Sequence, residues 1–106
     1  MTIEEKTKIE SEIVEVLKTV YDPEIPVNIY DLGLIYKIDL HEDGELFLDM
    51  TFTSPTCPAA DFILEDVHQK VSNVEGVKKA HVEMVFDPAW DRSMMTEEAR
   101  LELGLD

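Results

Sequence analysis

The sequence has only one cysteine among its 106 residues, so no disulfide can form within the chain. A lone cysteine is typical of proteins from reducing compartments, and residues 1–6 are polar and partly acidic, unlike a signal peptide. No apolar run approaches the roughly 20 residues that a membrane helix needs. These absences predict a cytoplasmic protein without a membrane-spanning helix.

Basic residues are also scarce, since 9 Lys and Arg stand against 24 Asp and Glu and give a formal net charge of −15. Binding to nucleic acid or to an anionic membrane needs clustered Lys and Arg. The composition therefore argues against both partners. It suits a protein that meets basic protein surfaces or metal cations, or one whose acidic charge simply keeps it in solution.

Apolar side chains at helical spacing predict a helix over residues 5–21 and a second helix that follows Pro58 and runs to about Ser72. Thr96 is suited to cap a short helix in a C-terminal tail of residues 95–106. Because 106 residues fit one domain of ordinary size, we expect a single domain over residues 1–106.

Three stretches alternate between apolar and polar side chains, which predicts strands from about residue 34 to 40, 46 to 53 and 77 to 86. Asp43-Gly44 between the first two is a hairpin signal. The apolar residues expected to face the core are Leu34, Tyr36, Ile38, Leu40, Leu46, Leu48, Met50, Phe52, Ala80, Val82, Met84 and Phe86. Asp49, Thr51 and Thr53 are expected on the outer face.

The element order α-β-β-α-β-α predicts an α+β fold, a two-layer sandwich with helices on one face of a small mixed sheet. The third strand should return parallel to the second, while the hairpin makes the first strand antiparallel to both. The start of the first strand then lies beside the ends of the other two. Three loops should gather at this edge: residues 22–33, 53–58 and 87–90.

Cys57 stands directly before Pro58, and proline favours the first position of a helix. We therefore predict Cys57 as the N-cap, where unpaired backbone N–H groups and the helix dipole favour the thiolate. A thiolate binds soft metals or attacks electrophiles. The equally supported alternative is a buried structural cysteine, because free cysteines are among the most buried residues.

Acidic residues are frequent in the other two loops. Asp22 and Glu24 flank Pro23, and Asp31 and Asp87 follow at the same edge. Their carboxylates suit oxygen ligands, a proton acceptor or hydrogen bonds that order the loops. Acidic residues beside prolines are most often turn formers.

The remaining polar and aromatic candidates are less specific. His41, His68 and His81 are all expected away from Cys57, which disfavours a thiol enzyme with a histidine base. Trp90 and the methionines that follow it predict either a tail that folds over the sheet edge or an exposed surface for a partner.

Four ordered segments of this chain resemble the motifs of a known family. They are Asp22-Pro23-Glu24-Ile25, Ile29-Tyr30-Asp31-Leu32-Gly33-Leu34-Ile35-Tyr36, Thr53-Ser54-Pro55-Thr56-Cys57-Pro58 and Phe86-Asp87-Pro88-Ala89-Trp90. The pattern is similar to that of the small metal–sulfur cluster biosynthesis family that includes bacterial SufT. Its relatives are the PaaD component of phenylacetate oxidation and the small subunit of the eukaryotic cytosolic iron–sulfur targeting complex.

This resemblance implies a non-enzymatic assembly factor that binds iron–sulfur scaffold and client proteins. It implies that Cys57 is the residue of interest, supported by the loop residues Asp22, Pro23, Glu24, Asp31, Thr53, Ser54, Pro58, Asp87 and Trp90. Because clusters usually take four protein ligands, one thiolate cannot hold a cluster alone. We therefore expect Cys57 to lend one transient ligand to an iron–sulfur cluster or to iron, in a carrier or adaptor.

Two further interpretations stay open. The chain is alternatively an interaction module without metal ligation, or an accessory component of a phenylacetate-type ring-oxidation system. A homodimer is also considered, because Ile35, Phe47 and Val85 are expected on the polar face of the sheet, where they would supply apolar contacts.

Overall fold

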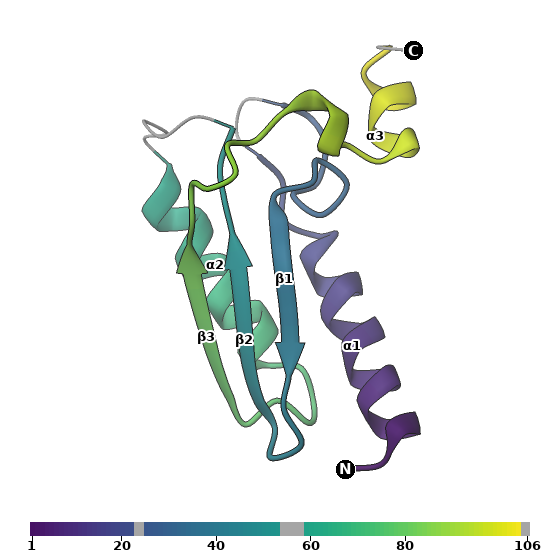
Figure 1. Cartoon of the computed structure of the whole chain (residues 1–106), viewed down its shortest axis with the longest axis vertical. Coiled ribbons are helices and arrows are strands. Elements are labelled where there is room, and N and C mark those ends of the chain that lie inside the picture. The colour runs from purple at the N-terminus through teal and green to yellow at the C-terminus, as the bar shows by residue number, and fades with distance from the viewer. Residues whose placement is uncertain (23–24, 54–58, 105–106) are drawn as a thin grey trace.

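The computed structural model describes residues 1–22, 25–53 and 59–104, and it has the element order predicted from the sequence (Figure 1). The elements are α1 (Ile3–Leu17), β1 (Ile35–Leu40), β2 (Glu45–Met50), α2 (Ala60–Ser72), β3 (Lys79–Met84), the 3₁₀ helix η1 (Arg92–Met94) and α3 (Glu97–Glu102). The strands lie in the order β1-β2-β3, with β1 antiparallel and β3 parallel to β2. The predicted α+β class and mixed sheet are confirmed.

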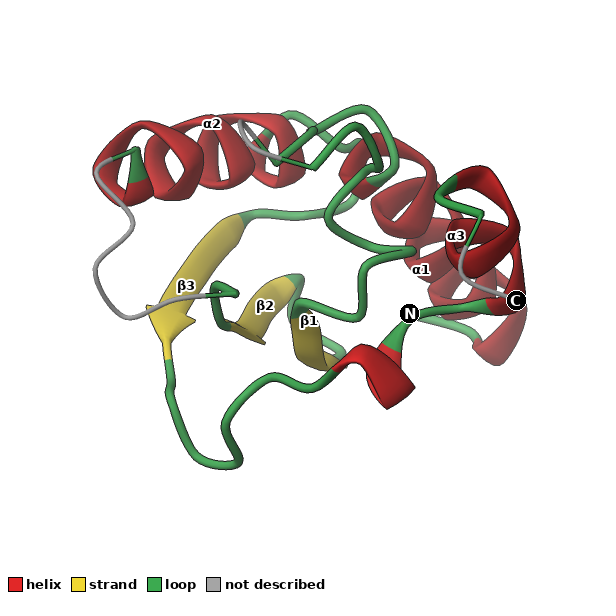
Figure 2. Ribbon diagram, turned by 90° about the horizontal axis from the view of Figure 1, so that it is seen from above, coloured by secondary structure: helices red, strands yellow, loops and turns green. Residues whose placement is uncertain are grey.

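The two long helices cover one face of the sheet (Figure 2). The chain that follows β3 crosses the other face before it reaches η1 (Figure 2). Within the described part of the chain, no helix is long and apolar enough to cross a membrane.

Helix α1 begins two residues earlier than predicted because Thr2 and Glu5 form a capping box. The Thr2 hydroxyl accepts a hydrogen bond from the Glu5 amide at 3.1 Å, and a Glu5 carboxylate oxygen accepts one from the Thr2 amide at 3.3 Å. The helix buries Ile9, Ile13 and Leu17 against the sheet layer and ends at Leu17, four residues before the predicted end.

Strand β2 forms the centre of the core, as its alternation predicts. Leu46, Leu48, Met50 and Phe52 are all at least 98% buried. Burial of such side chains stabilises a fold by about 1.5–3 kcal/mol each. The helix side of the central strand therefore anchors the packing of both layers.

Strand β1 departs from the predicted alternation because it contains a bulge. Ile35 pairs with Met50 and Lys37 pairs with Asp49, so two steps of β1 oppose one step of β2. A bulge leaves one extra residue and re-aims its side chain. Ile35 consequently packs against the core, although it was predicted on the outer face of the sheet. Tyr36, which was predicted in the core, instead contacts Pro88 in the chain that follows β3.

Strand β3 ends at Met84, two residues before the predicted end. The amide of Val85 still donates to the carbonyl of Met50 at 2.8 Å, but the chain then turns away through a cis Asp87–Pro88 bond. Phe86, which was expected to face the core, is therefore 46% exposed.

Thr51 lies just beyond β2 and is completely buried, although the alternation placed it on the outer, solvated face. Its backbone amide donates to the carbonyl of Leu34 at 2.8 Å, but its side-chain hydroxyl has no hydrogen-bond partner among the residues that the structure describes. A buried hydroxyl without a partner costs about 1–3 kcal/mol.

We expect the Thr51→Val substitution to stabilise the protein by about 1 kcal/mol, because valine keeps the branched shape and removes the unpaired hydroxyl. The free energy of unfolding in urea measures this effect. A loss of stability instead would mean that the hydroxyl makes a hydrogen bond in solution.

Candidate functional site

Three segments meet at the end of the sheet where β1 begins and β2 and β3 end, and we call this end the motif edge (Figure 1). Its described parts are residues 25–34, residues 51–53 and a strap made of residues 85–95. Hydrogen bonds join these segments, since Thr51 donates to Leu34, and the Trp90 indole N–H donates to the Leu32 carbonyl at 2.7 Å. The predicted convergence is thus observed for the described parts of the three loops.

The strap is held to the open face by Tyr36. Its hydroxyl donates to the carbonyl of Pro88 at 2.9 Å and lies 3.4 Å from the Met94 sulfur. Partial burial raises the pKa of the Tyr36 hydroxyl above its ordinary value, which keeps this donor protonated. Sequence reasoning did not identify this role because it placed Tyr36 in the core.

The tail packs within the monomer. Trp90 is half-buried, whereas Met95 and Ala99 are at least 93% buried and belong to the core. The Thr96 hydroxyl caps α3 by accepting from the Ala99 amide at 3.2 Å. Of the two interpretations given to Trp90 and the methionines, the tail folded over the edge is therefore the one observed.

We expect Trp90→Phe to lower the free energy of unfolding by about 1 kcal/mol, because phenylalanine keeps most of the packing but leaves the Leu32 carbonyl without its donor. Thermal unfolding followed by circular dichroism measures the change. An unchanged melting temperature would show that the indole N–H does not hold the strap.

The described acidic candidates act mainly as turn formers. Asp22 is 94% buried, and its carboxylate accepts from the Ile25 amide at 3.1 Å. The Asp31 carboxylate accepts from the Asn28 side-chain amide at 2.9 Å, and the Asp31 backbone carbonyl accepts from the Thr96 amide at 2.9 Å. These hydrogen bonds order the first loop and attach the C-terminal helix to it. Asp87 is exposed and Thr53 half-buried.

The other predicted site residues, Pro23, Glu24, Ser54, Cys57 and Pro58, lie outside the described residues. The prediction that Cys57 caps the second helix therefore falls outside the described part of the chain, where α2 has the bounds Ala60–Ser72 with Ala59 at the N-cap position.

The three histidines each have a partner away from the motif edge. His41 and His81 pair with Asp39 and Glu45 at 3.0 and 2.6 Å, and the His68 ring lies 3.1 Å from the Ala80 carbonyl oxygen. Across residues 1–22, 25–53 and 59–104, no group of three or more His, Cys, Asp or Glu side chains is arranged to hold a metal ion.

The open face carries an aromatic row that sequence reasoning did not identify. The Phe47 ring stacks on His81 with centroids 4.6 Å apart and contacts His41 at 4.8 Å. Alternation alone could have found the pair, because it places Phe47 and His81 on the outer face of adjacent strands. Phe47 therefore packs against the two histidine rings of its own chain, and Ile35 packs against the core. A homodimer through Ile35, Phe47 and Val85 stays a prediction.

Comparison with known proteins decides the family. Residues 10–84 match the family model described as iron–sulfur cluster assembly protein. The chain belongs to this family. The resemblance to SufT-like proteins predicted from the motifs is thereby confirmed.

Relatives in the iron–sulfur cluster assembly family match almost the whole chain. A protein of Porphyromonas gingivalis named Fe-S protein maturation auxiliary factor is 59% identical over 90% of both chains. The maturation auxiliary factor SufT of Staphylococcus aureus is 34% identical, covering 81% of this chain and 98% of its own. A solved structure of a domain of unknown function from Bacillus anthracis superposes with a TM-score of 0.85 at 35% identity, covering 94% of this chain and 95% of that one.

Proposed function

We propose that this chain helps to deliver iron–sulfur clusters to client proteins, as a carrier or adaptor in which Cys57 lends one transient ligand. The observation that carries the proposal is the 59% identity, over 90% of both chains, to a protein named Fe-S protein maturation auxiliary factor. A likeness of that extent supports a shared role in iron–sulfur protein maturation. The names of the compared relatives describe auxiliary factors, which supports a non-enzymatic role.

The chemistry of the cargo limits what one chain can do. An iron–sulfur cluster usually takes four thiolate ligands, and this chain has one cysteine. Cys57 therefore supplies a single ligand while the donor protein, the recipient protein or small thiols supply the others. Such partial ligation suits transfer, because a cargo held by one protein ligand is released more readily than one held by four.

The motif edge serves this role as a rigid frame. Three of its side chains are engaged with the protein itself: Asp31 orders the first loop, and Tyr36 and Trp90 hold the strap. We propose that Asp22, Asp31, Thr53, Asp87 and Trp90 support the site by shaping the edge around the Cys57 segment. The same supporting role is proposed for Pro23, Glu24, Ser54 and Pro58.

The lone cysteine and the proposed cargo also suggest where this protein works and with which partners. We propose that the chain works as one domain in the cytoplasm, where a lone thiol stays reduced. Its partners are iron–sulfur scaffold and client proteins, and a homodimer that places two Cys57 thiolates on one cluster is an allowed arrangement.

Anaerobic cluster transfer tests the proposal. A reconstituted [4Fe–4S] donor protein is mixed with an apo-aconitase, with and without this protein at a concentration below that of the donor. We expect the protein to raise the rate at which aconitase activity appears. Equal rates in the two mixtures would contradict a carrier or adaptor role.

A further inference from the structure

A groove with an apolar floor runs between α1 and the end of α2, on the helix side of the sheet. Two adjoining hollows of about 210 and 330 Å³ form it, and both are lined by Glu12 and Glu75. Its floor consists of Ile9, Val16 and Val74, of which Ile9 and Val74 are at least 91% buried. The floor therefore offers a small apolar contact, mainly at the half-buried Val16, for a side chain of an incoming segment.

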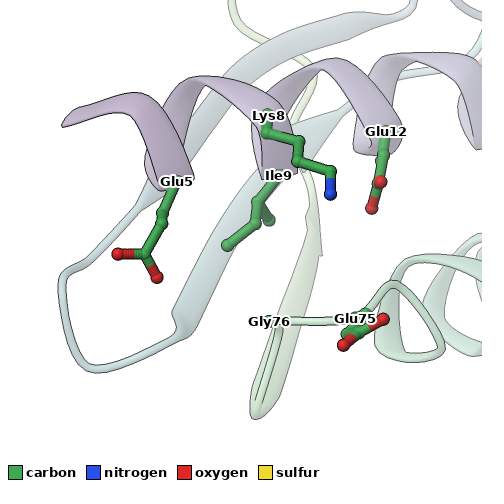
Figure 3. A pocket seen from close by; sticks show the side chains of 6 residues that line it. All are labelled: Glu5, Lys8, Ile9, Glu12, Glu75 and Gly76. Atoms are coloured by element: carbon green, nitrogen blue, oxygen red, sulfur yellow. The ribbon is translucent and has the colours of Figure 1, made fainter. Parts of the chain in front are cut away.

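The rim of the groove is acidic. The carboxylates on it belong to Glu5, Glu12, Glu15 and Glu75, and the cations to Lys8 and Lys70. Figure 3 shows Glu5, Ile9 and Glu12 extending from α1 toward the turn that carries Glu75 and Gly76.

The rim carboxylates outnumber the rim cations. Lys70 is already engaged by Asp66 at 3.3 Å. Within the described residues Lys8 forms no ion pair, and neither do Glu5, Glu12, Glu15 and Glu75, so four carboxylates share the rim with one unpaired lysine. Carboxylates that meet no cation in the monomer favour a partner that brings cations.

We propose that this groove docks an amphipathic helical segment of a partner protein, with an apolar stripe on the floor and Lys or Arg against the rim. A groove between two helices with apolar and charged zones is the geometry in which an amphipathic helix binds. Charge complementarity selects a basic occupant. A second copy of this chain is disfavoured, because each copy carries a net charge of −15.

The position of the groove fits an adaptor. It opens near Gly76, whose neighbour in space is the hairpin glycine Gly44, at the end of the molecule opposite the motif edge (Figure 1). A partner bound there leaves the motif edge accessible. The inference rests on the proposed function only in identifying the partner as a protein of iron–sulfur maturation. Binding of a peptide to the groove can be tested without any metal.

Amide chemical shifts of the ¹⁵N-labelled full chain provide the test. Two synthetic amphipathic peptides share one leucine stripe, but the stripe is flanked by Lys and Arg in one peptide and by Glu in the other. We expect the basic peptide to shift amides around Ile9, Val16 and Val74 and the acidic peptide to shift none of them.

Matched variants separate the groove from general charge attraction. The double variant Glu12→Lys/Glu75→Lys should weaken binding of the basic peptide about tenfold. The variant Glu42→Lys/Glu83→Lys changes the net charge equally at exposed positions outside the groove and should weaken binding no more than about twofold. Equal weakening by both variants, or shifts centred away from the groove, would overturn the inference, whether or not the protein transfers clusters.

Discussion

Replacing Cys57 with serine is expected to reduce cluster transfer to the rate measured without the protein. Serine keeps the size of the side chain, but its hydroxyl is a poor ligand for iron compared with a thiolate. Because Cys57 is the only cysteine, no second thiol can take its place. The anaerobic transfer to apo-aconitase described above measures the loss, and iron bound by the protein after reconstitution should fall with it.

A neighbouring substitution provides the control. Thr56→Ala changes the same segment, keeps the thiol and alters no residue proposed to support the site, so it should keep most of the transfer rate. If Cys57→Ser transfers as well as the parent protein, the ligand role is wrong and only an adaptor role remains. If Thr56→Ala is as defective as Cys57→Ser, the loss belongs to the segment and not to the thiol.

Replacing Gly33 with alanine is expected to lower the free energy of unfolding by about 3 kcal/mol. Gly33 has a φ of +84°, and a left-handed backbone costs an L-residue about 1–2 kcal/mol. A Cβ at this position would also lie 2.7 Å from the Met94 carbonyl carbon and overlap the strap. Overpacking of this kind adds about 1–3 kcal/mol, because a backbone must move to relieve it.

Trp90 is the only tryptophan and reports on the strap directly. Urea unfolding measures the stability of Gly33→Ala, and a red shift of the native fluorescence would indicate that the strap has moved.

Gly104→Ala is the matched control for this substitution. Gly104 also has a positive φ, of +68°, but within the described residues nothing beyond its own chain neighbours lies within 4 Å of its added Cβ. It should lose only the backbone cost of about 1–2 kcal/mol and keep the native fluorescence. Equal losses at the two glycines would show that contact between Gly33 and the strap is unimportant.

The order of elements and the core of β2 could be predicted because both depend on local periodicity. Leu46, Leu48 and Met50 alternate without interruption, and all are fully buried. The topology followed from the right-handed strand–helix–strand connection and the hairpin. These two steps were enough to bring the three loops to one edge.

Periodicity failed where the chain leaves a regular strand. The bulge in β1 moved Ile35 inward and Tyr36 outward, and no local feature of the sequence marks it. Thr51 was expected in solvent but is completely buried. The Tyr36 hydroxyl contacts Pro88 in the segment that crosses the open face, and such a long-range contact cannot be derived from the spacing of nearby residues.

The sequence predicted which residues lie at the candidate site better than it predicted what each of them does there. Asp22 and Asp31 lie at the expected edge, where their carboxylates accept hydrogen bonds from the Ile25 amide and from the Asn28 side chain. These hydrogen bonds order the first loop, and the role of both residues at the site stays a proposal. The start of α2 was predicted too early, because proline is tolerated at the first position of a helix but does not make a helix begin there.

The most direct test of the central claim is a deletion of the gene in its own host. We predict that the activities of iron–sulfur enzymes such as aconitase fall, while an enzyme without a cluster, measured in the same extracts, keeps its activity. Expression of the parent protein should restore the lost activities. Unchanged activity of every iron–sulfur enzyme in the deletion strain would contradict a role in iron–sulfur protein maturation.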